Sequence, residues 1–330
     1  MTLAEVLVVK TVKVYDFASK KLYALVAIIA IISGCGNPPA TKIHSSQPAP
    51  TVINLAEHVF AQLASRTNGA RGNFVWIPDN QAVTATNLHM DASFFLRDVT
   101  NILAASQTDI SKGSSYSCAN YLTAISPRFC VSAAHTAARN SDAYNGRKML
   151  WLLPSGAFYT NAAIAGFVIS NADLMVCLMA NTNPFFCRVL PVVTNKVPAL
   201  KYGQSPQNLP LPAVLFRGGD GTPEPHTAFV LSLTSDGSSG VASYGSPVDS
   251  FVFGGYKGHD GWISGDSSSP AYVIINNEAA LIGVASSPLS SSFVSARLAE
   301  VNSAMAALAN AAGIPTEAVT LFDLSDFAEF

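Results

Sequence analysis

The sequence predicts an all-β protein that ends in one helix. Short apolar stretches that could form strands recur through the middle of the chain, and glycines and prolines that favour turns separate them. The stretch 271–286 contains Asn276-Asn277, and asparagine tolerates the left-handed conformation, so we expect a hairpin turn there. Apolar residues then repeat at helical spacing from Leu298 to Leu308, which predicts a C-terminal helix.

Composition excludes two broad classes of protein. With 330 residues, 49% of them apolar and 12% charged, the chain can bury a sizeable core and does not resemble a disordered protein. The net charge of −2 gives no reason to expect nucleic acid or an anionic membrane surface as a partner.

The first 35 residues have the pattern of an export signal. Lys20 and Lys21 precede the apolar run Leu22–Ile32, whose eleven residues are too few for a membrane-spanning helix of about 20. The run ends in Ile32-Ser33-Gly34-Cys35, which resembles the lipobox of bacterial lipoproteins. This resemblance implies a lipid on Cys35 and an exported protein, held on the periplasmic side or the cell surface by that anchor alone. The alternative is an ordinary secretory signal with a chance cysteine, which would give a secreted protein.

Four further cysteines raise the question of disulfides. Cys118 and Cys130 flank a predicted hairpin, and Cys177 and Cys187 flank the turn-rich run Asn181–Pro184. Four cysteines can pair in three ways, and we expect the two local pairs, Cys118–Cys130 and Cys177–Cys187. The alternative is four buried free thiols, which are commoner in cytosolic proteins than after an export signal.

Three short segments hold residues with catalytic potential. Two alanines after an apolar stretch lead to His135, and small neighbours leave an imidazole room to approach other groups. Asp173 opens the apolar strand Leu174–Leu178, and a carboxylate buried there needs compensating partners. The turn Gly265–Ser267 precedes another apolar strand and could expose the serine hydroxyl while aiming backbone N–H groups at one point. Taken singly, the three segments could be a structural histidine, a strand cap and a serine-rich loop.

Together, the segments resemble the three signatures of the trypsin-like serine peptidases. Ile125–His135 is similar to the stretch that ends in Ala-Ala-His, and Ala172–Leu178 is similar to the Asp-Leu strand. Gly265–Pro270 resembles the Gly-Asp-Ser-Gly-Gly-Pro signature, and the order His, Asp, Ser is that of this family. Nineteen residues after the serine of that signature, Ser286 resembles the family's serine that contacts the catalytic aspartate and the substrate backbone. The resemblance covers about half of the chain.

The resemblance implies a fold of two six-stranded antiparallel β-barrels with a site between them. His135 and Asp173 would come from the first barrel, and Ser267 from the second. The corresponding division of the chain is 1–35 for the signal and lipobox segment, 36–68 for a tether and short helix, 69–200 for the first barrel, 201–295 for the second barrel, and 296–330 for the C-terminal helix and tail.

The resemblance also implies an activity, that of a serine endopeptidase acting on a polypeptide substrate. Ser267 would attack the acyl carbon, His135 would carry the proton, and Asp173 would orient the imidazole. The backbone N–H groups of Gly265 and Ser267 would form the oxyanion hole. No cofactor or metal is expected, since the remaining histidines show no ligand spacing. Nothing in the sequence indicates the oligomeric state.

Substrate preference is predicted from the position six residues before the nucleophile, where the family has its pocket floor. That position is Gly261, so we expect no preference for Lys or Arg before the cleaved bond, although Asp260 is only one position away. The bulk of Trp262 predicts a small or shallow apolar pocket. Gly261, Trp262 and Ser286 are therefore the candidate substrate-binding residues.

Two serines depart from the family pattern. Ser268 and Ser269 stand where the signature has glycines, and a serine held at positive φ costs on the order of 1 kcal/mol. This departure keeps an alternative function open, that of a catalytically impaired scaffold acting as a surface binding lipoprotein. A structural β-sandwich whose motifs match by chance is a second alternative.

Overall fold

The computed structural model describes twelve stretches of the chain. They are residues 53–68, 74–76, 88–90, 93–99, 122–139, 148–152, 157–192, 211–217, 224–233, 241–245, 261–262 and 266–328. All of them belong to one unit, Val52–Phe330. The predicted signal segment with Cys35 lies outside the described residues.

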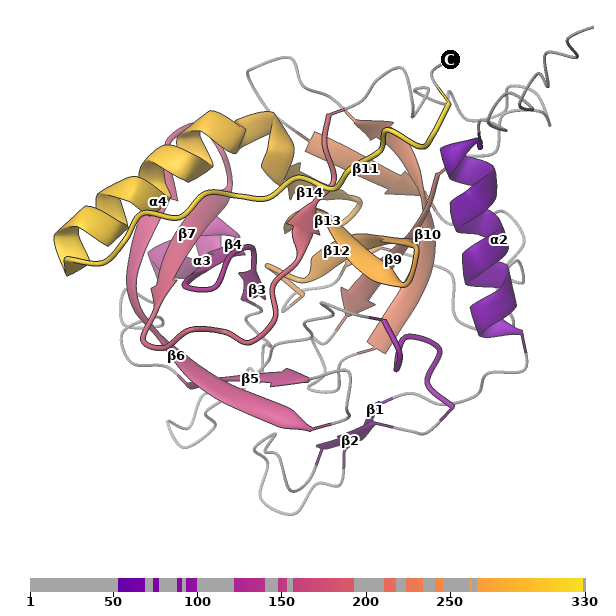
Figure 1. Ribbon diagram of the computed structural model, residues 1–330, viewed down its shortest axis with the longest axis horizontal. Coiled ribbons are helices and arrows are strands. Elements are labelled where there is room, and N and C mark those ends of the chain that lie inside the picture. The colour runs from indigo at the N-terminus through magenta and orange to yellow at the C-terminus, as the bar shows by residue number, and fades with distance from the viewer. Residues whose placement is uncertain are drawn as a thin grey trace, which may run out of the picture. The chain divides into compact units, whose positions relative to one another are not determined.

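A closed barrel forms the second half of this unit (Figure 1). Its six antiparallel strands follow one another around the barrel, and the last pairs with the first. In that order they are β12 (Pro270–Ile275), β9 (Leu211–Arg217), β10 (Glu224–Leu233), β11 (Val241–Gly245), β14 (Ser290–Phe293) and β13 (Glu278–Ser287). A short parallel strand, β8 (Arg188–Val189), is added to β13. Closure leaves these strands with few exposed edges, and the predicted second six-stranded barrel is confirmed.

The hairpin between β12 and β13 is where the sequence predicts it. Asn276 and Asn277 have φ values of 50° and 65°, so both central residues of the turn are left-handed. A two-residue turn of this kind matches the right-handed twist of the flanking strands.

A five-stranded antiparallel sheet, here called the first sheet, forms the other half. In spatial order its strands are β3 (Thr123–Ala124), β4 (Phe129–Ser132), β7 (Leu174–Met179), β6 (Phe158–Ile169) and β5 (Lys148–Leu152). Strands β4 and β7 are buried along their whole length, and their sequences are apolar except for Ser132 at the end of β4. The described residues thus give this half five of the six strands expected for a first barrel. A separate pair of strands, β1 (Phe74–Trp76) and β2 (Leu88–Met90), is antiparallel.

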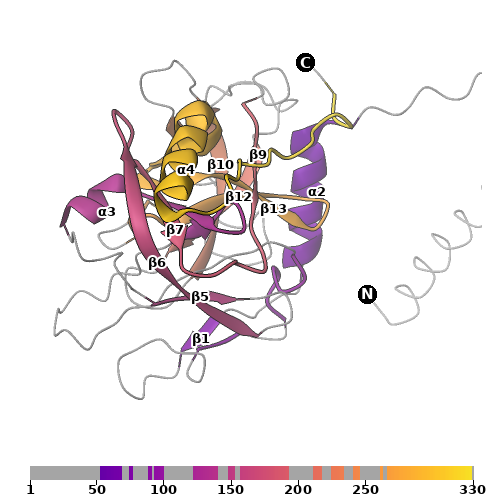
Figure 2. The ribbon, with the colours of Figure 1, turned by 60° about the vertical axis from the view of Figure 1, so that its left-hand side comes forward.

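The helices near the two ends of the described chain cover different sheets (Figure 1 and Figure 2). The helix α2 (Leu55–Thr67) is capped by the Asn54 side chain and packs on β9 and β12 of the barrel. The predicted C-terminal helix is α4 (Leu298–Ala312), which follows the 3₁₀ turn η2 (Val294–Arg297) and packs on β6 and β7 of the first sheet. No helix in the described part of the chain combines the length and the apolar character that crossing a membrane requires.

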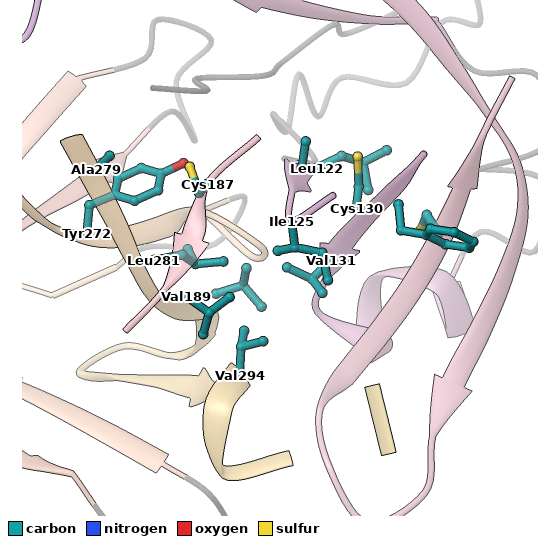
Figure 3. Packing of buried hydrophobic residues seen from close by; sticks show 14 of the residues in the cluster. Leu122, Ile125, Cys130, Val131, Cys187, Val189, Tyr272, Ala279, Leu281 and Val294 are labelled. Atoms are coloured by element: carbon teal, nitrogen blue, oxygen red, sulfur yellow. The ribbon is translucent and has the colours of Figure 1, made fainter. Parts of the chain in front are cut away.

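The core divides according to the alternation of side chains along the barrel strands. On β12, Val273 and its alternate neighbours point into the barrel, while Tyr272 and Ile274 point outward into a second apolar cluster. This second cluster, which we call the apolar junction, joins the barrel to the first sheet (Figure 3). Both faces of β12 are buried, which explains its continuous apolar sequence.

Neither predicted disulfide is formed. Cys130, Cys177 and Cys187 are buried in the apolar junction and form no disulfide, and Cys118 lies outside the described residues. Cys177 lies within β7, opposite Cys130 of β4. Cys187 lies just before β8, and its backbone N–H donates to the carbonyl of Ala124. The turn-rich run therefore does not fold Cys187 back onto Cys177, and the local pairing was the wrong expectation. Burial raises the pKa of all three thiols.

Candidate active site

Strand pairing brings His135 and Asp173 together. Strand β4 ends at Ser132, and the short helix α3 (Ala134–Arg139) begins two residues later with His135 in its first turn. Asp173 immediately precedes β7, and Ser132 lies opposite Met175 in the antiparallel β4–β7 pair. The end of one strand thus meets the beginning of the other.

The Asp173 carboxylate holds His135 at two points. Oδ1 accepts a hydrogen bond from the backbone N–H of His135 at 2.8 Å, and Oδ2 lies 2.6 Å from Nδ1 of the ring. A carboxylate on Nδ1 favours the tautomer that carries its proton there. Nε2 of the neutral ring is then left as a hydrogen-bond acceptor.

Ser267 completes the group from the other half of the molecule. It lies in the turn before β12, partly exposed, and its Oγ is 2.6 Å from Nε2 of His135. Three residues that the sequence nominates from separate segments therefore form one hydrogen-bonded chain, Asp173–His135–Ser267.

In the turn that carries Ser267, one of the two serines that replace glycines has a left-handed backbone. Ser268 has φ 75°, whereas Ser269 is not among the described residues with positive φ. The Ser268 hydroxyl is buried, accepts a hydrogen bond from the backbone N–H of Ala133 at 2.9 Å, and lies 2.7 Å from Ser132 Oγ. Each bond is worth about 1 kcal/mol net, so together they outweigh a conformational cost of about 1 kcal/mol.

Of the two predicted oxyanion-hole residues, one is described. Gly265 lies outside the described residues, and Ser267 occupies the turn just discussed. Asp266, which directly precedes the candidate nucleophile Ser267, is fully buried, and its carbonyl accepts a hydrogen bond from the N–H of Ser269 at 2.9 Å. This bond closes the turn, and the bond from Ser268 N–H to Ala285 O at 3.1 Å fixes the turn to the barrel.

Residues predicted to line a substrate pocket lie beside the β13–β14 turn. Gly261 has φ 110°, a conformation that favours glycine. Trp262 is only 5% exposed, because its indole N–H donates to Phe216 O at 3.0 Å and its ring packs edge-on against Tyr244 at 5.5 Å between centroids. The side chain expected to limit the pocket thus belongs largely to the barrel core.

Ser286 makes a different contact from the one its resemblance implies. Its hydroxyl donates to the carbonyl of Ser290 at 3.4 Å within the β13–β14 hairpin. It is Ser292 whose hydroxyl donates to the Asp173 backbone carbonyl, at 2.9 Å. Sequence reasoning missed Ser292 because a run of serines resembles a loop, and missed Ser132 because it ends an apolar strand. Only the register of the strands identifies them.

Metal chemistry has no candidate site in the part of the chain that the structure describes. There, no three His, Cys, Asp or Glu side chains are grouped so that they could hold an ion.

Comparisons with known proteins find similarity only to solved structures, at low identity. No family model matches the sequence, and no curated protein matches it. One similar solved structure is a kallikrein-related peptidase 10 complex with Zn²⁺, at 13% identity and a TM-score of 0.37, covering 64% of this chain and 98% of that one. Another is the secreted serine protease VesC from Vibrio cholerae, at 13% identity and a TM-score of 0.39, covering 62% of this chain and 46% of that one.

Proposed function

We propose that this protein is an exported serine endopeptidase that hydrolyses peptide bonds through an acyl-enzyme intermediate. The observation that carries the proposal is the hydrogen-bonded chain from Asp173 through His135 to Ser267, with 2.6 Å at both links. A hydroxyl, an imidazole and a carboxylate in this order are the groups that acyl transfer requires.

The proposed chemistry follows from which atoms touch. Ser267 Oγ attacks the carbonyl carbon while its proton passes to His135 Nε2. The resulting imidazolium is stabilised by Asp173 and returns the proton to the leaving amine as the peptide bond breaks. Water then attacks the ester while His135 accepts its proton, and the ester bond breaks as His135 returns that proton to Ser267 Oγ. The backbone N–H groups of Gly265 and Ser267 are our candidates for holding the oxyanion.

Substrate and location are further parts of the proposal. We propose a polypeptide substrate without a basic residue before the cleaved bond, since Gly261 stands at the expected pocket floor. We also propose export with a lipid on Cys35, supported by the charged, then apolar, then Ile-Ser-Gly-Cys order.

Reaction with a fluorophosphonate probe tests the activity directly. Folded wild-type protein should gain the mass of one probe less HF, since the serine displaces fluoride, on the peptide that contains Ser267, and should lose that reactivity after heat denaturation. Ser267→Ala should not react, while its thermal unfolding stays that of the wild type. Unreactive, folded wild-type protein would overturn the proposal, as would equal labelling of Ser267→Ala.

The second candidate function is a binding lipoprotein with impaired catalysis. The left-handed backbone of Ser268, directly after the nucleophile, is the observation that favours it. A folded wild-type protein that fails to react with the probe is the result that this candidate predicts.

A further inference from the structure

Ser267 and His135 come from distant parts of the sequence. They are 132 residues apart in sequence and belong to different halves of the unit, one on the turn before β12 and the other on α3 after β4. Their 2.6 Å contact therefore depends on how the barrel is fixed to the first sheet near this point.

The Ser268 hydroxyl makes such a connection next to both residues. It accepts from the backbone N–H of Ala133 at 2.9 Å and lies 2.7 Å from Ser132 Oγ. Ser268 is one residue from Ser267, and Ala133 is two residues from His135. Ser132, Ala133 and Ser268 are all 0% exposed, so water does not compete for these bonds.

The backbone of Ser268 is fixed to the barrel, which makes the connection a rigid one. Its N–H donates to Ala285 O of β13, and the next residue closes the turn by donating to Asp266 O. The hydroxyl therefore cannot follow a movement of β4 without disturbing the turn that carries the nucleophile.

We propose that Ser268 is a positioning residue, whose hydroxyl fixes Ser267 Oγ against His135 by joining the nucleophile turn to the end of β4. The expected effect on reaction rate rests on the proposed function, whereas the expected effect on the Ser267–His135 contact does not. A displacement of about 1 Å between reacting groups can slow a reaction about 10²-fold. Loss of the Ser268 hydroxyl should therefore lower reactivity without unfolding the protein.

Four variants separate positioning from stability. With a fluorophosphonate on the full chain, Ser268→Ala should lower the maximal inactivation rate (kinact) roughly tenfold to 10²-fold, with the probe's KI unchanged. Ser132→Ala, which keeps the bond to Ala133, should have a smaller effect, and the double variant should be no slower than Ser268→Ala. The matched control is Ser269→Ala, since the Ser269 hydroxyl is buried in the same turn with no hydrogen-bond partner among the described residues. Its kinact should equal that of the wild type.

Ser268→Gly distinguishes positioning from backbone strain. Glycine adopts φ 75° freely, so a purely conformational role predicts equal or faster reaction, whereas the positioning role predicts a loss similar to that of Ser268→Ala. A kinact within twofold of wild type in folded Ser268→Ala or Ser268→Gly overturns the inference.

The nitrogen NMR signals of the His135 ring test the inference without requiring enzymatic turnover. Loss of the contact between Ser267 Oγ and Nε2 changes the Nε2 chemical shift, so Ser268→Ala should shift it in the same direction as Ser267→Ala. If the wild type is unreactive, the proposed function fails while this shift still decides the inference. Wild-type ring shifts in Ser268→Ala would overturn it. If Ser268→Ala does not fold, Ser132→Ala decides by the same measurement.

Discussion

Among the described residues, two of the regions where the halves of the molecule meet are built on opposite principles. One is a polar seam, defined as Ser132, His135, Asp173, Ser267 and Ser268. Hydrogen bonds of 2.6 to 2.9 Å join its first-half residues and the Ala133 N–H to the turn before β12, and Asp173 holds His135 within the first half. The other is the apolar junction, where the thiols of Cys130, Cys177 and Cys187 pack among aliphatic side chains and Tyr272. Figure 3 shows Cys130, Cys187 and Tyr272 in this cluster. In the seam each group needs a particular partner at a particular angle, whereas in the junction a side chain needs only the right volume. The first kind of contact therefore constrains residue identity much more strongly.

Of the changes that distinguish the polar seam from the apolar junction, Asp173→Asn is expected to have the largest effect on probe reactivity. The amide has a donor where the carboxylate has only acceptors, so His135 would be held in the tautomer that cannot accept the Ser267 proton. We expect kinact for a fluorophosphonate to fall about 10⁴-fold, as for triads generally, while thermal unfolding changes little.

The control for this change is Asp98→Asn. Asp98 is an exposed carboxylate whose printed bonds go to Arg66 and not to a residue of the polar seam, so this variant should react like the wild type. A loss of less than tenfold in Asp173→Asn would mean that the carboxylate does not set the tautomer of His135.

The buried thiols of the apolar junction should instead affect how the free energy of unfolding depends on pH. Burial raises the pKa of the thiols of Cys130, Cys177 and Cys187 above the ordinary 9.0, so the folded state keeps protons that the unfolded chain releases. The stability that they contribute is complete below pH 9 and decreases as the pH rises above it. Three thiols give a loss of about 4 kcal/mol between pH 8 and pH 10, and the buried Tyr244 and Tyr272, whose pKa values are also raised, add to it at still higher pH.

Denaturant unfolding under reducing conditions at several pH values measures this loss. Cys177→Ala should reduce the alkaline loss by about a third, because one titrating group is removed. A free energy of unfolding that stays level from pH 8 to pH 10 would show that these thiols do not titrate on unfolding, as a disulfide would not.

The same contrast explains how much the sequence could predict. His135, Asp173 and Ser267 were predicted because each lies in a short segment that resembles a family signature, and the Asn276-Asn277 turn was predicted because few residues adopt its backbone. The cysteine pairs were wrong because local spacing does not show which strands lie opposite each other. Cys130 faces Cys177 through the β4–β7 register, which joins segments 47 residues apart. A barrel needs that register before any of its cross-strand contacts is defined.

The contacts of Trp262 and Ser292 could not be predicted from any local sequence pattern. The indole of Trp262 is drawn into the barrel by its bond to Phe216 O, a residue 46 positions away. Ser292 reaches Asp173 across 119 positions, from a strand whose neighbouring serines make other contacts. Each contact depends on the closed barrel as a whole, and the sequence around it carries no corresponding constraint.

The smallest effect that we predict compares two adjacent serines of β14. Successive residues of a strand point to opposite sides, so Ser292 donates to the Asp173 carbonyl at 2.9 Å while Ser291 Oγ lies 2.7 Å from the buried Tyr244 hydroxyl inside the barrel. Ser292→Ala removes one hydrogen bond that positions Asp173, worth about 1 kcal/mol, and should lower kinact about fivefold. Ser291→Ala leaves the Tyr244 hydroxyl without that partner and should lower the free energy of unfolding by about 1–2 kcal/mol with kinact within twofold of the wild type. Probe kinetics and denaturant unfolding on the two variants check this division. Equal changes in kinact would show that β14 supports the seam only through the stability of the barrel, and not through the Ser292 hydroxyl.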